Sequence, residues 1–162
     1  MVDSLFAHRG SVLFDHDGTL VDSIALVVAA TNAVLAHNDG QPVAETDVVA
    51  GMIWPTGQRL GRLLGVTESR RQAQLAVTFY DEARRLGAHY ARLYPGMKEL
   101  LVQLHYKRVS LGMVSNNEGQ LIRELASAFG VSGYLAVMLG EDDVARPKPA
   151  PDGIRQALAG LG

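Results

Sequence analysis

Residues 11–19 read Ser-Val-Leu-Phe-Asp-His-Asp-Gly-Thr, and they carry the strongest indication of the fold. Its first four residues form a short apolar run, which is typical of a strand buried on both faces in a parallel sheet. The polar residues that follow, with Gly18 among them, predict a loop at the carboxyl end of that strand. Open α/β sheets bind their ligands at this edge, so functional side chains are expected there.

Strand and helix patterns alternate again in the last part of the chain. The expected elements are a helix over residues 97–106, a strand over 109–114, a helix over 118–129, a strand over 134–139 and a helix from residue 152. This alternation predicts an α/β fold with a parallel sheet and right-handed crossovers. Residues 21–92 show helical periodicity with no evident strand. We therefore predict a core made of residues 1–20 and 93–162, with a helical insertion at residues 21–92.

Composition excludes several classes of protein. The 162 residues carry a net charge of −2, which argues against a nucleic-acid or anionic-membrane binder held by bulk charge. The absence of cysteine excludes disulfides, thiolate zinc sites and cysteine nucleophiles. The longest apolar run, residues 24–30, is too short to span a bilayer. We expect a cytoplasmic protein with neither a nucleic-acid nor a membrane partner.

Three segments could carry chemistry. Asp15 and Asp17 can project into one pocket, where one carboxylate could attack phosphorus and the other shuttle a proton, while Gly18 could form an anion-binding nest with its neighbours. An Asp- and Gly-rich turn is the alternative. Ser115 follows the strand at 109–114 and could donate to a phosphate oxygen, or cap the next helix. Lys148 lies between two prolines that stiffen its backbone, which suits either an ammonium with a fixed target or a rigid solvent loop.

Together and in this order, these segments resemble a known family, the haloacid dehalogenase-like phosphatases. Residues 12–23 (Val-Leu-Phe-Asp-His-Asp-Gly-Thr-Leu-Val-Asp-Ser) are similar to its first motif, 114–117 (Val-Ser-Asn-Asn) to its second and 146–152 (Arg-Pro-Lys-Pro-Ala-Pro-Asp) to its third. Tyr94-Pro95-Gly96 resembles the family's return into the core. The resemblance is strongest to the branch with a helical cap inserted after the first motif, which includes phosphoglycolate phosphatases.

The resemblance implies a doubly wound, Rossmann-like parallel sheet and a Mg²⁺-dependent phosphoric-monoester hydrolase for a small, phosphoglycolate-like metabolite. Asp15 would be the nucleophile that forms an aspartyl-phosphate, and Asp17 would act as acid and then as base. The Asp15 carboxylate and the Asp17 backbone carbonyl would bind Mg²⁺. The residues implied to hold phosphate are Gly18, Thr19, Ser115, Asn116 and Lys148.

In the implied cap, residues 51–59 are the expected substrate-facing loop. Arg59 could meet an anionic group or lie on a solvated helix face, and Trp54 could wall the pocket or pack in the cap's core. His16 is expected to be a spacer whose side chain points away from Asp15 and Asp17, because side chains alternate along an extended segment.

The family's fourth motif, a strand ending in acidic residues that complete the magnesium site, has no counterpart in the printed sequence. A helix, a connection and a strand would need about 20 residues after the lysine loop, and fewer follow. In the family that strand lies beside the first, so residues 11–15 are expected to form an exposed apolar edge that could pair with another copy. The sequence is therefore interpreted as a truncated core with weakened Mg²⁺ binding and catalysis.

Two alternatives remain open. The first is a non-catalytic phosphate-binding or regulatory module, which would bind phosphate analogues without turnover. The second is a sugar-phosphate mutase of the same family, which product analysis with sugar phosphates would separate.

Overall fold

The computed structural model describes residues 10–162, which form two compact units. The core unit comprises residues 10–22 and 92–162, and the cap unit comprises residues 23–91. The first nine residues of the predicted core lie outside the described residues. No helix in the described part of the chain is both long and apolar enough to cross a membrane.

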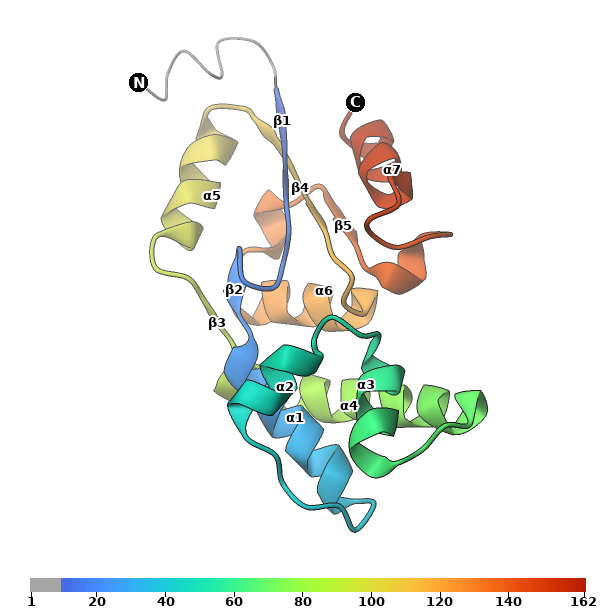
Figure 1. Ribbon diagram of the computed structural model, residues 1–162. Coiled ribbons are helices and arrows are strands. Elements are labelled where there is room, and N and C mark those ends of the chain that lie inside the picture. Colours follow the sequence, from blue (N-terminus) through green and yellow to red (C-terminus); the bar gives the residue numbers. More distant parts are fainter. Residues whose placement is uncertain (1–9) are drawn as a thin grey trace. The chain divides into compact units, whose positions relative to one another are not determined.

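A three-stranded parallel sheet forms the centre of the core unit (Figure 1). Its strands β1 (Ser11–Phe14), β4 (Ser110–Val114) and β5 (Val137–Leu139) lie in the order β1-β4-β5. Phe14 pairs with Met113, and Val114 pairs with Leu139. The predicted α/β fold with a parallel sheet is confirmed. β5 is shorter than the sequence predicted, because Ser132–Tyr134 form a turn of 3-10 helix instead of extended chain.

Helices cover both faces of this sheet, as a doubly wound fold requires. The core unit contains α5 (Met97–Tyr106), α6 (Gly119–Ala128) and α7 (Asp152–Leu161), and Figure 1 shows α5 and α7 on opposite sides of the strands. Val114 packs with Ala157 of α7 in a buried cluster. Met113, the residue before it in β4, instead lines a pocket with Ala126 of α6. Successive side chains of β4 thus pack against helices on opposite faces of the sheet.

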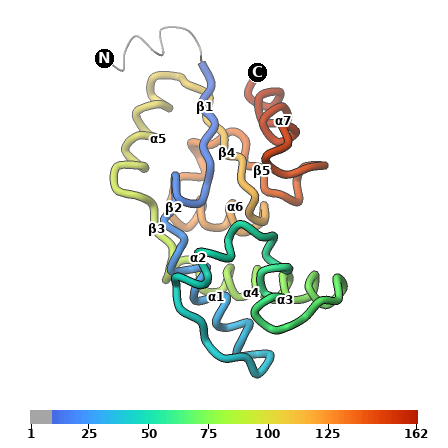
Figure 2. The backbone as a smooth tube through the Cα atoms, in the orientation of Figure 1, coloured from blue at the N-terminus to red at the C-terminus, as the bar shows by residue number. Residues whose placement is uncertain are grey.

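A short antiparallel ribbon lies where the chain leaves and re-enters the core unit (Figure 2). It pairs β2 (Val21–Asp22) with β3 (Arg92–Leu93). The sequence did not reveal these strands, since two residues are too few to show a period of alternation. Beside the ribbon, the N–H of Tyr94 donates to the carbonyl of Leu20 at 3.0 Å. The two crossings between the units are therefore held together.

Among the described residues, the cap unit consists of helices joined by loops, and the predicted helical character is confirmed. The helices are α1 (Ile24–Ala36), α2 (Glu45–Gly51), α3 (Thr56–Leu64) and α4 (Ser69–Tyr90). α4 buries Leu75, Phe79 and Ala83 at helical spacing. Gly65 ends α3 with a φ of 68°, in the left-handed region that glycine adopts without a steric penalty.

Candidate functional site

The loop after β1 reverses direction within a few residues. The carbonyl of His16 accepts hydrogen bonds from the N–H groups of Leu20 at 3.1 Å and Val21 at 2.9 Å. Gly18 has a φ of 71°, which a residue with a Cβ atom rarely adopts. This turn keeps Asp15 and Asp17 close to the carboxyl end of β1.

The anion-binding nest at Gly18 stays a prediction, and two N–H groups at this turn make hydrogen bonds inside it. The N–H of Gly18 donates to the carbonyl of Val21 at 2.9 Å, and the N–H of Thr19 points to the carbonyl of His16 at 3.4 Å. Both groups are engaged inside the turn, because the tight reversal needs these bonds to close. Thr19 is exposed.

An ion pair joins the first motif to the third. The Nζ of Lys148 lies 2.7 Å from Oδ1 of Asp15 and donates to the carbonyl of Val114 at 3.0 Å. The Asp15 side chain is 47% exposed and that of Lys148 is 27% exposed, so the pair is open to solvent. The structure therefore brings the carboxylate and the ammonium singled out by the sequence into contact at one edge of the sheet.

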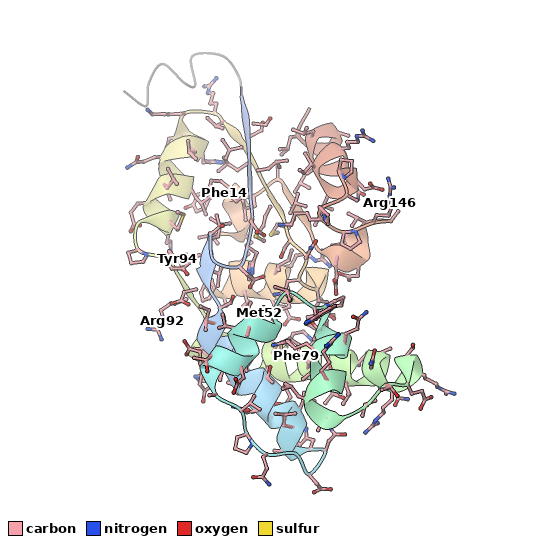
Figure 3. The ribbon with its side chains drawn as sticks, viewed as in Figure 1. Phe14, Met52, Phe79, Arg92, Tyr94 and Arg146 are labelled. Carbon is pink, nitrogen blue, oxygen red and sulfur yellow. The ribbon has the colours of Figure 1, made fainter. Side chains whose placement is uncertain are left out.

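A second ion pair braces the loop that carries Lys148. Arg146, at the edge of the core unit in Figure 3, places Nη2 2.9 Å from Oδ2 of Asp152. The hydrogen bonds and charge of this pair raise the pKa of Arg146 and lower the pKa of Asp152. The two partners lie on either side of the segment that contains Lys148 and its flanking prolines. The ion pair therefore restricts movement of this segment.

Ser115 and Asn116 follow β4 directly. Ser115 is buried, and its Oγ accepts a hydrogen bond from the N–H of Asn117 at 3.0 Å, while a hydroxyl can still donate its own proton. Asn116 was predicted to hold phosphate, but its amide is used elsewhere. Its Nδ2 donates to the carbonyl of Lys148 at 2.8 Å and its Oδ1 accepts from the N–H of Lys148 at 2.8 Å. Asn116 therefore fixes the backbone of Lys148.

Sequence reasoning missed Asn117, which contacts Asp17. Its Nδ2 lies 3.2 Å from Oδ2 and 3.4 Å from Oδ1 of that carboxylate. The feature of the sequence that could have identified Asn117 is its position next to Ser115 and Asn116 in the second motif.

His16 does not point away from both aspartates as predicted. Its side chain is 1% exposed, and Nδ1 lies 3.1 Å from Oδ1 of Asp17. Neither ring nitrogen has the geometry of a hydrogen bond to any described residue, and the ring lines the apolar pocket that also contains Met113. The expectation failed because the chain leaves the extended conformation after Phe14, so alternation along a strand no longer applies.

The two cap residues proposed for substrate contact have different surroundings from those expected. Arg59 is 4% exposed, so it is not on a solvated helix face. Its Nη1 donates to Oγ1 of Thr31 at 3.2 Å, and its guanidinium lies 5.1 Å from the centre of the Phe79 ring, on α4 in Figure 3. Burial lowers the pKa of Arg59, and the nearby Tyr80 opposes that shift.

Trp54 is not part of the cap's core, since 40% of it is exposed. The guanidinium of Arg62 stacks over its ring at 4.0 Å. Met52, labelled in Figure 3, and Ile53 are also exposed, so the loop after α2 presents apolar side chains to solvent.

The acidic turn at Glu141–Asp143 braces the loop of the second motif. The N–H of Gly119 donates to Oδ1 of Asp142 at 2.6 Å, and Oδ2 of Asp143 accepts from the N–H of Gly140 at 2.9 Å. Burial pushes the pKa of Asp143 up, but the Gly140 N–H and Arg123, whose Nη1 lies 2.7 Å away, hold that pKa below its ordinary value. A Cβ on Gly140 would clash with the backbone of Gly119 and lie 2.6 Å from the carbonyl oxygen of Asn117. The close packing at Gly140 therefore admits only glycine.

The donor set suits a hard divalent cation. Asp15 and Asp17 supply the carboxylate and carbonyl oxygens that Mg²⁺ prefers, and the Asp15 carboxylate is exposed enough to be reached. Residues 10–162 contain no group of three or more His, Asp or Glu side chains placed to hold a metal ion. Mg²⁺ is commonly held by one or two carboxylates together with substrate oxygens and several waters.

Comparison with known proteins agrees with this geometry. Residues 12–162 match the model of the family described as haloacid dehalogenase-like hydrolase. The chain belongs to this family. It is 33% identical over 165 residues to the phosphoglycolate phosphatase of Yersinia pestis, an alignment that covers 96% of the chain and 68% of that relative. The plasmid phosphoglycolate phosphatase of Cupriavidus necator is 32% identical, with 91% and 65% covered.

Solved structures of the haloacid dehalogenase-like fold are similar in shape. The crystal structure of CbbY from Rhodobacter sphaeroides in complex with phosphate has a TM-score of 0.81 at 23% identity, covering 95% of this chain and 73% of that one. The family resemblance and the hydrolase class inferred from the sequence are confirmed. The chain spans about two thirds of the length of the curated relatives it matches.

Proposed function

We propose that this family member is a Mg²⁺-dependent phosphatase that hydrolyses a small phosphomonoester through an aspartyl-phosphate on Asp15. The observation that carries the proposal is the 2.7 Å contact between Lys148 and Asp15. Attack on a phosphomonoester brings two anions together, and a cation beside the attacking oxygen offsets their repulsion. Asp17 follows β1 and Ser115 follows the neighbouring strand β4. The groups needed for both steps therefore come from adjacent loops.

In the first step, an oxygen of Asp15 forms a bond to phosphorus as the bond from phosphorus to the leaving oxygen breaks. Asp17 gives its proton to that oxygen, and the alcohol leaves. In the second step, Asp17 takes a proton from water, whose oxygen attacks the same phosphorus. Asp15 is regenerated and orthophosphate leaves. Lys148 and the hydroxyl of Ser115 hold the phosphoryl oxygens throughout.

Mg²⁺ would be held by the carboxylate of Asp15 and the backbone carbonyl of Asp17, and when bound it supplies positive charge that neutralises the phosphoryl group. Lys148 performs part of the same task from the opposite loop, since its ammonium is already 2.7 Å from Asp15.

Substrate choice is assigned to the cap, in the loop at residues 51–59. Trp54 supports this role because it is exposed, whereas the buried Arg59 is better suited to holding that loop in shape. The names of the curated relatives support a phosphoglycolate-like substrate, and the phosphate in the CbbY complex is compatible with a phosphate-binding site. The outer edge of β1 has no neighbouring strand among the described residues, and a strand of another copy could add there.

The test is release of p-nitrophenol from p-nitrophenyl phosphate, with Mg²⁺ and with a chelator. We expect Mg²⁺-dependent turnover that Asp15→Asn abolishes. Asp39→Asn is the matched control, because Asp39 lies in a cap turn with a φ of 55°, which asparagine also tolerates. Phosphate binding without turnover, or unchanged activity in Asp15→Asn, would contradict the proposal.

A further inference from the structure

The proposed mechanism gives Asn117 no task. We propose that Asn117 is a positioning residue, whose amide holds the carboxylate of Asp17 in the orientation needed to protonate the leaving oxygen. This inference rests on the proposed function, which makes Asp17 the proton donor. Asn117 itself touches no reacting atom in this scheme.

The amide of Asn117 can face Asp17 in only one way. Its Oδ1 accepts a hydrogen bond from the N–H of Glu118 at 2.9 Å, and its Nδ2 lies 3.2 Å from Oδ2 of Asp17. Rotating the amide by half a turn would set Nδ2 against an N–H donor and Oδ1 against a carboxylate acceptor. Both contacts would then be repulsive, so the local backbone selects the orientation that donates to Asp17.

The backbone of Asn117 is fixed as firmly as its side chain. Its N–H donates to Oγ of Ser115 at 3.0 Å, and its carbonyl accepts from the N–H of Glu141 at 2.9 Å. Gly140 packs directly against this loop, with no room for a Cβ. Because the backbone of Asn117 is already fixed by these hydrogen bonds, its side chain can restrain Asp17 with little further loss of conformational entropy.

Asp17 needs restraint because it lies in a turn and is 26% exposed. Its carboxylate must deliver a proton to one oxygen atom, and small errors in position cost a proton donor much of its effect. Nδ2 of Asn117 lies 3.4 Å from Oδ1 and 3.2 Å from Oδ2, so this amide limits the rotation of the carboxylate.

Asn116 provides the contrast within the same motif. Its amide binds the backbone of Lys148, so it acts on the phosphate-binding side of the site. Two adjacent asparagines thus hold two different groups, and their substitution should affect different steps.

A series of aryl phosphates separates positioning from general damage. Loss of a proton donor matters most when the leaving phenol is weakly acidic. We expect Asn117→Ala to reduce kcat for phenyl phosphate about 10-fold more than for dinitrophenyl phosphate, since general acid catalysis contributes roughly 10²–10⁴-fold. Asn117→Asp keeps the acceptor for Glu118 and sets a carboxylate against Asp17, so it should show at least the same selectivity. Equal losses on both substrates would overturn the proposal.

A matched control is available in the cap unit. Asn32 makes the same kind of clamp, with Nδ2 donating to the carbonyl of Val43 at 3.2 Å and Oδ1 accepting from its N–H at 2.9 Å. Asn32→Ala should reduce stability while leaving the ratio of the two rates unchanged. A similar change of ratio in Asn32→Ala would show that the effect is not specific to Asn117, and would overturn the proposal.

The contact can also be measured without turnover. Free energies of unfolding in urea for Asn117→Ala, Asp17→Ala and the double variant form a cycle that isolates the interaction between the two residues. We expect the two single effects to be non-additive. Additive effects would overturn the positioning role, while a parent chain that hydrolyses neither aryl phosphate would count against the proposed function instead.

Discussion

Lys148 in the core unit and Arg59 in the cap unit are both cations that the sequence suggested for anion binding, yet their surroundings are opposite. Lys148 is partly exposed and contacts the carboxylate of Asp15. Arg59 is almost fully buried, and its contacts are the hydroxyl of Thr31 and the face of Phe79. Among the described residues, no carboxylate lies within ion-pair distance of Arg59.

The difference shows what makes a cation available for chemistry. An ammonium on a loop, paired with an exposed carboxylate, can exchange that partner for a phosphoryl oxygen at small cost. A guanidinium enclosed by a hydroxyl and a ring has already lost most of its water, and its aliphatic stem fills space in the cap. We assign Lys148 to binding and Arg59 to the shape of the cap.

Lys148→Met tests the first assignment with the largest expected effect. Removing the ammonium leaves the developing phosphoryl charge without its cation, and loss of one such donor costs about 10²–10³-fold in rate. Phosphate release should therefore fall by at least about 100-fold, with weaker binding of orthophosphate by calorimetry. If Lys148→Met retains the parental turnover, the assignment of Lys148 to phosphate binding is contradicted.

Arg59→Met is the matched change in the cap. Methionine fills much of the same space, so its stability should stay near that of the parent, and its affinity for orthophosphate should be unchanged. Arg59→Ala should lose about 2 kcal/mol or more in urea unfolding, because a buried side chain leaves a cavity. Loss of orthophosphate binding in Arg59→Met would move Arg59 to the binding site and contradict the comparison.

Asn116→Ala tests whether the Asn116 amide fixes the backbone of Lys148. Without the two 2.8 Å bonds to its backbone, the lysine loop should sample more positions. We expect orthophosphate to bind about 10-fold more weakly, a loss of the size that two exposed hydrogen bonds allow. Hydrogen exchange should show a faster Lys148 amide, and an amide exchanging at the parental rate would contradict the clamp.

Asp143→Asn extends the comparison to ion pairs, with a smaller expected effect than the variants above. The pKa of Asp143 is lowered in the folded state, so its contribution is complete above the unfolded value of about 3.9 and disappears as the pH falls through the folded pKa. The variant should lose about 1 kcal/mol of unfolding free energy at neutral pH, and the difference from the parent should shrink below about pH 4. Asp81→Asn, from an exposed pair with Arg84 on α4, should change stability less. A loss of stability that does not depend on pH would show that the ionised Asp143 carboxylate is not the source of the stabilisation.

The sequence predicted the part of the site that depends on chain order. Ser115 could be placed beside the Asp15 loop because polar residues at the carboxyl ends of parallel strands share one edge, and the family resemblance implied that Lys148 joins them. The sheet followed from short apolar runs that end in polar loops, and the helical insertion followed from helical periodicity. The first-strand edge was also predicted, and β1 lies at the edge of the described sheet.

What the sequence did not predict depends on packing between distant segments. The burial of Arg59 is set by Thr31 and Phe79, which come from other helices. The orientation of His16 is set by a turn whose hydrogen bonds appear only in three dimensions. Asn116 and Asn117 are neighbours of the same type, and only their partners distinguish their roles.

In the proposed mechanism, Asp15 carries the phosphoryl group during turnover. Rapid acid quenching of a reaction with p-nitrophenyl phosphate and Mg²⁺, followed by peptide mass analysis, measures this directly. We expect a phosphoryl group on the peptide that contains Asp15 and none on that peptide in Asp15→Asn. Turnover with no phosphorylated peptide, or with the group on another residue, would contradict it.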